Sequence, residues 1–228
     1  MQILIDVGTV LLGYIIGSIP FGFLIVKFKT GQDIRNIESG RTGGTNTVRA
    51  AGFWPGLLTA ILDILKGTVA VWVAQALTGN HLIHVLAPVG AILGHNYSIF
   101  LASRDSTGKL RFFGGAGGAP ALGGAAGLWL PMFPIVFITA LIIWFTIGIA
   151  SVTTMAIGLI VSVTFAIRAY LGQQPSIDIL YGVLALFLLA WSLRPNLKKL
   201  MAGEERIVSI SLNGRLRARK ESKKTNNQ

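Results

Sequence analysis

The sequence predicts an all-α integral membrane protein, a compact bundle of about seven transmembrane helices, some of them short. The 228 residues are 52% hydrophobic and only 13% charged, whereas a soluble domain carries about 25% charged residues. Several apolar runs reach the length of about 20 residues that a helix needs to cross a bilayer. The Lys and Arg residues, which give a net charge of +11, mostly cluster beside these runs.

Most of the apolar runs each predict one helix, but residues 114–170 admit either two long helices or three short ones. That segment is almost uncharged, and Pro120, Pro131 and Pro134 interrupt it, which favours three short helices. The spans are therefore expected at about residues 3–26, 53–77, 82–101, 115–130, 132–148, 150–170 and 177–193.

Polar stretches mark the ends of these runs. The first run stops before Lys27 and Lys29, and later runs stop at TGN, at SRDSTGKLR and at GQQPS. Within the first run, Gly13 and Gly17 have the four-residue spacing that lets membrane helices approach closely. This spacing favours a packed bundle over isolated anchors.

The basic residues predict the orientation. Half of them lie from Arg194 to the end, and two further clusters lie at 27–49 and 104–111. Cytoplasmic loops carry such clusters, and all three fall on that side if the N-terminus is outside and the C-terminus is cytoplasmic. Five spans would give the same sides. We expect a membrane-embedded domain over residues 1–205 and a basic, disordered cytoplasmic tail over 206–228.

Composition also excludes several classes of function. Basic residues beside apolar spans indicate contact with anionic lipid and not with nucleic acid. The chain has no cysteine, which excludes disulfides and thiolate nucleophiles. His81 and His84 could share a helical face, but they lie at the outer edge without carboxylates, so no metal site is expected. The first apolar run lacks a preceding basic segment, which indicates a retained span and not a cleaved signal.

The stretch SGRTGGTNTVRAAG, residues 39–52, is the first candidate site. Its glycines expose backbone amides, and its hydroxyls and guanidinium groups add donors, which together make a phosphate cradle at a helix N-terminus. A solvated loop with helix caps is an equal alternative on composition alone. The candidate donors of this stretch are Ser39, Thr42, Thr45 and Asn46, and Arg41 and Arg49 add positive charge.

Two later stretches could complete a polar pocket. GHNYSIF contains His95, which could carry a proton or be an ordinary interfacial histidine, and FFGGAGG follows it with Gly114, Gly115 and Gly117. RPNLKKLMAGEE, at the inner end of the last span, contains Asn196 and Glu205, but taken alone it is better explained as a stop-transfer cluster anchored by positive charge.

One ionisable pair lies inside a predicted span. Asp63 and Lys66 are three residues apart and so share a helical face. Ionisable residues within a membrane are functional candidates by default, and a structural ion pair is the alternative here.

These stretches occur in the order and spacing of one known family. GSIPFGFLIVK, GQDIRNIESGRTGGTNTVRAAG, DILKG, GHNYSIF, FFGGAGGAPALGG and NLKKLMAGEE resemble the bacterial acyl-phosphate-dependent glycerol-3-phosphate acyltransferases over nearly the whole chain. The resemblance implies a multi-pass enzyme of the bacterial inner (cell) membrane whose active site faces the cytoplasm. It implies acyl transfer from acyl phosphate to the 1-hydroxyl of glycerol 3-phosphate, giving lysophosphatidic acid in phospholipid synthesis, with no cofactor, metal or acyl-enzyme.

The resemblance also implies roles for the motif residues. It places Ser39, His95 and Asn196 at the chemistry. It places Thr45, Asn46, Arg49, Gly114, Gly115, Gly117 and Glu205 around the bound substrates.

The chain departs from the family pattern at several motif positions. The second motif usually resembles FKGGKG, and here Phe113 and Ala116 stand at the two lysine positions. The family usually has a histidine where this chain has Leu193, and SGN where this chain has SGR. Lys109, Arg111 or Arg41 is therefore expected to supply the missing charge. The alternative function is a non-catalytic membrane protein that binds a phosphorylated lipid precursor or a partner.

Overall fold

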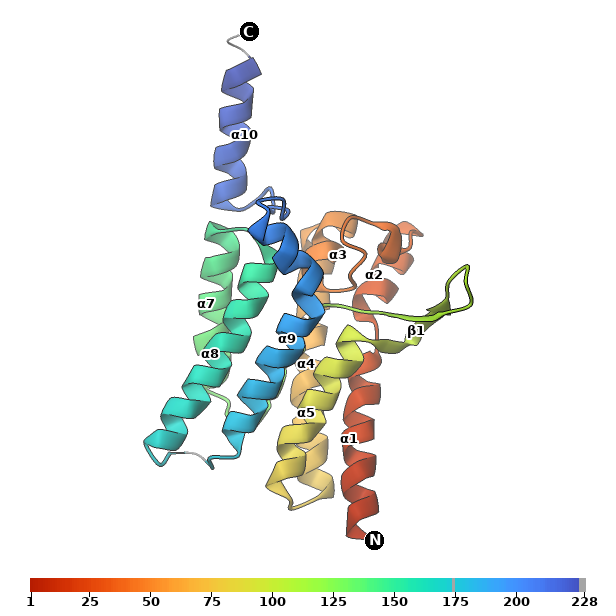
Figure 1. Cartoon of the computed structure of the whole chain (residues 1–228), viewed down its shortest axis with the longest axis vertical. Coiled ribbons are helices and arrows are strands. Elements are labelled where there is room, and N and C mark those ends of the chain that lie inside the picture. Colours follow the sequence, from red (N-terminus) through yellow and green to blue (C-terminus); the bar gives the residue numbers. More distant parts are fainter. Residues whose placement is uncertain (174, 226–228) are drawn as a thin grey trace.

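The computed structural model describes residues 1–173 and 175–225, with side chains up to residue 219. The chain forms a bundle of helices with one small β-hairpin at its side (Figure 1). The elements are α1 Gln2–Ser18, α2 Phe21–Thr30, the 3-10 helix η1 Ile34–Asn36, α3 Gly44–Ala51, α4 Phe53–Leu77, α5 His81–Asn96, β1 Ser98–Arg104, β2 Leu110–Phe113, α6 Gly118–Leu128, α7 Met132–Thr146, α8 Ala150–Tyr170, α9 Asp178–Met201 and α10 Leu212–Thr225.

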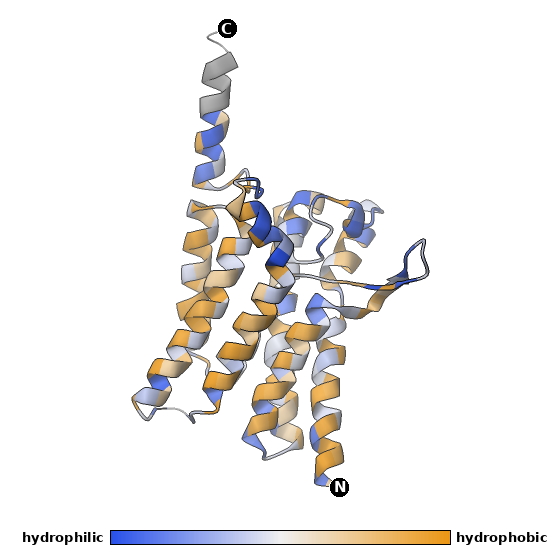
Figure 2. Ribbon diagram, viewed as in Figure 1, coloured by the Kyte–Doolittle hydropathy of each residue, from blue (hydrophilic) through white to orange (hydrophobic). Residues whose placement is uncertain are grey.

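The predicted helical membrane protein is confirmed. Four helical segments are long and apolar enough to cross a membrane, namely Gln2–Thr30, Phe53–Leu77, Ala150–Tyr170 and Asp178–Met201, and Met132–Thr146 is a shorter apolar helix. Apolar residues cover most of the bundle, and polar residues gather at the end that holds α2, α3 and the last turns of α9 (Figure 2). The N-terminus and helix α10 lie at opposite ends of the molecule (Figure 1). The number of spans and their orientation stay predictions.

The first apolar run differs from the expected uninterrupted span. It forms two helices, because α1 ends at Ser18 and α2 starts at Phe21. Pro20 lies at the break and has no N–H to continue a helical ladder. The break leaves the Ile19 carbonyl accessible to the Lys66 side chain, whose Nζ lies 3.2 Å away.

The third predicted span, expected to about residue 101, is also shorter. Helix α5 ends at Asn96, and the chain continues into strand β1, which pairs antiparallel with β2. The hairpin extends sideways from the bundle (Figure 1). Its two strands pair with each other across the turn. Hydropathy predicted a helix for this apolar stretch because hydropathy does not indicate which segments pair as strands.

The last span and the tail differ as well. Helix α9 continues past the expected end at about residue 193 to Met201, through Pro195. Within the tail expected to be disordered, the structure has helix α10 over Leu212–Thr225, a segment rich in Arg, Lys and Leu, which are good helix formers. Residues 226–228 of that tail lie outside the described residues.

The helices pack closely where their facing residues are small. A Cβ atom added at Gly13 or Gly17 of α1 would lie 2.3 Å or 2.1 Å from the carbonyl oxygens of Ala87 and Ala91 in α5. Only glycine permits this approach, as the four-residue spacing predicted.

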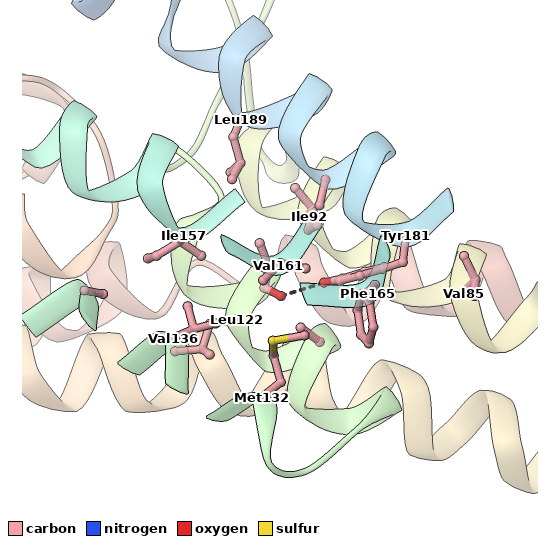
Figure 3. Close-up of a cluster of buried hydrophobic side chains, with 14 residues drawn as sticks. Val85, Ile92, Leu122, Met132, Val136, Ile157, Val161, Phe165, Tyr181 and Leu189 are labelled. Atoms are coloured by element: carbon pink, nitrogen blue, oxygen red, sulfur yellow. Dashed lines mark hydrogen bonds between the residues drawn. The ribbon is translucent and has the colours of Figure 1, made fainter. Parts of the chain in front are cut away.

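An apolar core lies between α5, α6, α7, α8 and α9 (Figure 3). Tyr181 is fully buried in it and donates a hydrogen bond of 2.7 Å to the Ala121 carbonyl oxygen, and Phe165 meets the Tyr181 ring edge-on. This core joins α9 to α6 and α8 and so fixes the polar end of α9 beside the loops that precede α3 and α6.

Candidate active site

A cavity of about 990 Å³ lies at the polar end of the bundle. The loop before α3, the loop before α6 and the C-terminal turns of α9 form its polar side. Its lining includes most of the predicted site residues, namely Ser39, Thr45, Asn46, Arg49, His95, Gly114, Gly117, Asn196 and Glu205. Segments that are more than 150 residues apart in the sequence therefore meet at one site.

The opposite side of the cavity is apolar and extends between α4, α6, α7 and α8. Its lining there consists of Leu57, Ile64, Leu122, Phe137, Leu141, Trp144, Phe145 and Ile157. The cavity therefore joins a polar end, which can hold charged groups, to a wall suited to a hydrocarbon chain.

Arg49 is a cation of the cavity lining with free hydrogen-bonding capacity. It belongs to α3, is half-buried and lines the cavity. Within the described part of the chain its guanidinium makes no hydrogen bond, so its donor fork remains available to a ligand. Burial lowers the pKa of Arg49, the nearby Glu38 raises it, and the group stays cationic because arginine does not deprotonate in proteins.

Arg41 braces three segments at the same end. Its Nη1 donates to the Gly115 carbonyl oxygen at 2.9 Å and to Ser192 Oγ at 3.1 Å. Its Nη2 donates to the Ser192 carbonyl oxygen at 2.6 Å and to Asn196 Oδ1 at 3.0 Å. Burial lowers the pKa of Arg41, and Glu205 is among the groups that oppose this shift. Arg41 is thus a partly buried cation held by neutral oxygen atoms.

Asn196 connects that cation to a carboxylate. It accepts from Arg41 through Oδ1 and donates through Nδ2 to Glu205 Oε1 at 2.9 Å. The amide is therefore held in one orientation, with a guanidinium on one side and a carboxylate on the other.

Asn46 holds the loop that precedes α3. Its buried Nδ2 donates to the Arg41 and Ile37 carbonyl oxygens at 2.9 and 3.0 Å. Ser39 and Thr45 line the cavity beside it. The Asn46 amide nitrogen, predicted to contact substrate, is occupied by the loop, whereas its Oδ1 has no partner in the described residues.

The glycine-rich segment lies against the end of α5. The backbone N–H of Gly115 donates to the His95 carbonyl oxygen at 2.9 Å. A Cβ atom at Gly115 would lie 2.0 Å from His95 Nε2, so this position must lack a side chain. Gly114 and Gly117 line the cavity directly, and Gly115 lies behind them.

His95, Lys66 and Asp63 form a buried cluster beside the cavity. Lys66 Nζ lies 2.7 Å from His95 Nδ1 and 2.9 Å from Asp63 Oδ1, and His95 Nδ1 lies 3.6 Å from Asp63 Oδ1. Each of the three side chains is at most 5% exposed. His95 and Asp63 also line the cavity.

The structure does not place Lys109 and Arg111 at this site. Both belong to the β-hairpin and are absent from the cavity lining. Arg111 Nε instead donates to Asp105 Oδ2 at 2.9 Å near the exposed tip. Strand pairing directs this segment away from the bundle, so the structure does not bring either residue to the cavity.

The residues at the departing motif positions do face the cavity. Phe113, Ala116 and Leu193 all line it. Of the three cations expected to supply the missing charge, Arg41 is the one that lies in the lining.

Two polar residues of the site were missed by sequence reasoning. Ser192 accepts from Arg41 twice, and Asn96 is buried in the lining with both side-chain polar atoms unpaired in the described residues. Asn96 directly follows the predicted site residue His95, and this position could have identified it. Ser192 lies in an apolar run, where no sequence feature distinguishes it as a site residue. Both carboxylate oxygens of Asp63 and one of Glu205 also lack a hydrogen bond in the described structure, and such buried groups are suited to a polar ligand.

The chain is similar to known acyltransferases. It matches the family profile of glycerol-3-phosphate acyltransferase over residues 7–203. It is 38% identical to glycerol-3-phosphate acyltransferase 2 of Moorella thermoacetica over 198 residues, which cover 86% of this chain and 94% of the relative. It is 36% identical to the glycerol-3-phosphate acyltransferase of Thermus thermophilus, over 88% of this chain and 94% of the relative.

Two solved structures have a similar fold. The crystal structure of PlsY, an integral membrane glycerol 3-phosphate acyltransferase, in its glycerol 3-phosphate form is 28% identical, with a TM-score of 0.74 over 89% of this chain and 95% of that chain. Its lysophosphatidic acid form is 26% identical, with a TM-score of 0.72 over 90% of this chain and 96% of that chain.

Proposed function

The chain belongs to the glycerol-3-phosphate acyltransferase family, and we propose that it transfers an acyl group from acyl phosphate to the 1-hydroxyl of glycerol 3-phosphate. The product is lysophosphatidic acid. The relatives that match most of this chain are named glycerol-3-phosphate acyltransferases. The matched crystal structures are the glycerol 3-phosphate and lysophosphatidic acid forms of one such enzyme.

The observation that carries the proposal is the two-sided cavity. Its apolar wall between α4, α6, α7 and α8 suits an acyl chain, and its polar end presents Arg49 with an unoccupied donor fork. A guanidinium group binds the paired oxygen atoms of a phosphate. Both proposed substrates carry phosphate, and the acyl donor also carries a hydrocarbon chain.

The reaction asks little covalent chemistry of the protein. Acyl phosphate is a mixed anhydride and is already activated. The glycerol 3-phosphate hydroxyl oxygen bonds to the acyl carbon, the bond from that carbon to the phosphate oxygen breaks, and the hydroxyl proton leaves with the phosphate group. The protein holds two anions together and stabilises the oxyanion, and one positioned donor at an oxyanion contributes about 3–4 kcal/mol.

The residues of the cavity suit these tasks. We assign the phosphate groups to Arg49, with Ser39 and Thr45 as hydroxyl donors and the Gly114–Gly117 backbone beside them. Asn196, held by Arg41 and Glu205, is assigned to the reacting carbonyl, and His95 to the same end of the cavity. An oriented donor of this kind needs no reorganisation during the reaction.

The proposed location is the bacterial inner membrane, with the site facing the cytoplasm. The basic residues of α2, α3 and the end of α9 lie at the polar end of the bundle together with the cavity (Figure 2). Membrane proteins keep such residues on the cytoplasmic side, where they also attract anionic lipid.

The experiment measures acyl transfer to radiolabelled glycerol 3-phosphate by the purified protein in lipid. Palmitoyl phosphate and palmitoyl-CoA are offered separately as donors. We expect labelled lysophosphatidic acid from palmitoyl phosphate alone. Product from palmitoyl-CoA alone would contradict the assigned donor, and no product from either would contradict the proposed activity.

A further inference from the structure

The ammonium group of Lys66 is surrounded by three acceptors inside the bundle. It lies 2.7 Å from His95 Nδ1, 2.9 Å from Asp63 Oδ1 and 3.2 Å from the Ile19 carbonyl oxygen. A lysine ammonium has three N–H donors and no acceptor. Two of these contacts are hydrogen bonds, to His95 Nδ1 and to the Ile19 carbonyl oxygen, and the third is an ion pair with the Asp63 carboxylate.

The contacts of the Lys66 ammonium group indicate which ring nitrogen of His95 carries the proton. The Asp63 carboxylate beside Lys66 stabilises the ammonium form, so the ammonium donates and Nδ1 of His95 accepts. A neutral imidazole carries its proton on the nitrogen that does not accept. We propose that Lys66 is a positioning residue that holds His95 as the neutral tautomer with its proton on Nε2, so that His95 donates a hydrogen bond to an anionic substrate group and does not act as a base. This proposal rests on the proposed function for the identity of the anion.

The second ring nitrogen faces the glycine-rich segment. A Cβ atom at Gly115 would lie 2.0 Å from Nε2, so the absence of a side chain there keeps the Nε2–H uncovered. His95 itself lines the cavity together with Gly114 and Gly117. His95 thus lies at the end of the cavity where phosphate and the oxyanion are assigned.

The cationic neighbours of His95 favour the same state, and the Asp63 carboxylate is engaged by Lys66. Helix α4 contributes Asp63 and Lys66, and the loop before α3 contributes Arg41. From α1, Tyr14 donates to the Tyr97 carbonyl oxygen at 2.8 Å and so does not compete for the ring. A proton on Nδ1 would face the Lys66 ammonium at 2.7 Å, which excludes both the imidazolium and the opposite tautomer.

The role of His95 follows from this tautomer. A base at Nε2 would need a free electron pair on that nitrogen, which requires the proton to move to Nδ1. Lys66 prevents that move. His95 is therefore assigned as a fixed hydrogen-bond donor and not as a carrier of protons during the reaction. Such a donor does not need to reorient when negative charge develops on the substrate.

The tautomer is measured directly by nitrogen NMR on histidine-labelled protein in lipid bilayers without substrate. The chain has three histidines, and His95→Gln assigns the signal of His95. We expect one protonated nitrogen, Nε2, and no titration between about pH 6 and about pH 8, the range in which an ordinary histidine titrates. A protonated Nδ1, or an imidazolium in that range, would overturn the proposal whatever the enzyme activity.

Two variants at Lys66 test what fixes the tautomer. Lys66→Met removes the donor and is expected to give a mixture of tautomers or a titrating ring, whereas Lys66→Arg keeps a cationic donor and the Nε2–H form. An unchanged His95 signal in folded Lys66→Met would overturn the role of Lys66. Should Lys66→Met not fold, the wild-type spectrum still decides the tautomer.

Variants at His95 test the donor in the acyl-transfer assay. His95→Gln retains an N–H donor near the Nε2 position, and His95→Ala retains none. We expect kcat to fall about 10²-fold in His95→Ala and to stay within about tenfold in His95→Gln, with no basic limb near the ordinary histidine pKa in the wild-type pH profile. Equal losses in both variants together with such a limb would contradict the donor role.

Discussion

Two regions of the molecule combine arginine side chains with glycine-containing turns, and they use them differently. At the cavity, Arg41 is partly buried and held by neutral oxygen atoms, and Arg49 makes no hydrogen bond in the described structure. At the tip of the β-hairpin, Arg111 is exposed and paired with Asp105. The cavity therefore holds positive charge that a ligand can compensate, whereas Asp105 already compensates the charge of Arg111.

This difference shows why a cation near a motif is insufficient evidence of a site. Lys109 and Arg111 are closer in sequence to the glycine-rich segment than Arg41 is. Arg41 nevertheless contacts that segment, through the Gly115 carbonyl oxygen at 2.9 Å. A partly buried cation without a direct carboxylate partner loses part of its hydration, and an anionic ligand in the cavity would compensate its charge.

Arg49→Ala should give the largest loss. The change removes the guanidinium with the free donor fork from the polar end of the cavity. We expect kcat/KM for glycerol 3-phosphate to fall about 10³-fold, as for the loss of a charged donor in a water-excluded site. Arg49→Lys keeps the charge without the fork and should recover part of the loss. Unchanged kinetics in Arg49→Ala would contradict the assignment of ligand binding to the arginine of the cavity.

Arg41→Ala should give the next largest loss. It leaves Ser192, Asn196 and the Gly115 carbonyl oxygen without their shared donor, which releases the Asn196 amide. We expect kcat to fall about 10²-fold, with KM less affected, in the palmitoyl phosphate assay. A change confined to KM would place Arg41 on a substrate phosphate instead of on the orientation of Asn196.

Gly115→Ala should give a smaller but clear loss. Its Cβ atom would meet His95 Nε2 at 2.0 Å, so the ring or the segment must shift. We expect kcat to fall about tenfold or more, since positioned donors tolerate little displacement. Gly8→Ala in α1 is the matched control, because a Cβ atom there meets nothing within 4 Å. Equal effects of the two changes would argue against a tight fit at His95.

The hairpin variants Lys109→Ala and Arg111→Ala should have the smallest effect. Hydrogen bonds from Thr107, with further donors at Lys109 and Arg111, lower the pKa of Asp105 to about 2. The carboxylate therefore stays ionised, and the tip stays intact, at any pH well above about 2. We expect kcat/KM within about twofold of wild type, as is typical of exposed ion pairs. A large loss in either variant would bring the hairpin into the site.

The sequence was sufficient where long apolar runs and an ordered set of motifs determine the outcome. Helices α4 and α8 have the predicted bounds of 53–77 and 150–170. Most of the predicted site residues meet in one cavity although α3 and α9 are far apart in the chain. Hydropathy predicts the length of an apolar helix, and the order of the motifs predicts which residues form the site.

The sequence was insufficient where contacts between distant segments decide. Hydropathy continued α5 into β1, because the pairing of Ser98 with Phe113 is not a local property. The hydrogen bonds that Arg41 donates to Ser192 and Asn196 depend on how α9 packs against the loop before α3. Composition alone cannot distinguish that arginine from Arg111.

The most direct test is equilibrium binding of radiolabelled glycerol 3-phosphate to the protein in lipid, with wild type, Arg49→Ala and the double variant Lys109→Ala/Arg111→Ala compared side by side. The distinction between the two regions predicts that Arg49→Ala loses binding and that the double hairpin variant binds as wild type does. Loss of binding in the hairpin variant, with binding retained in Arg49→Ala, would contradict it and place the phosphate site at the hairpin.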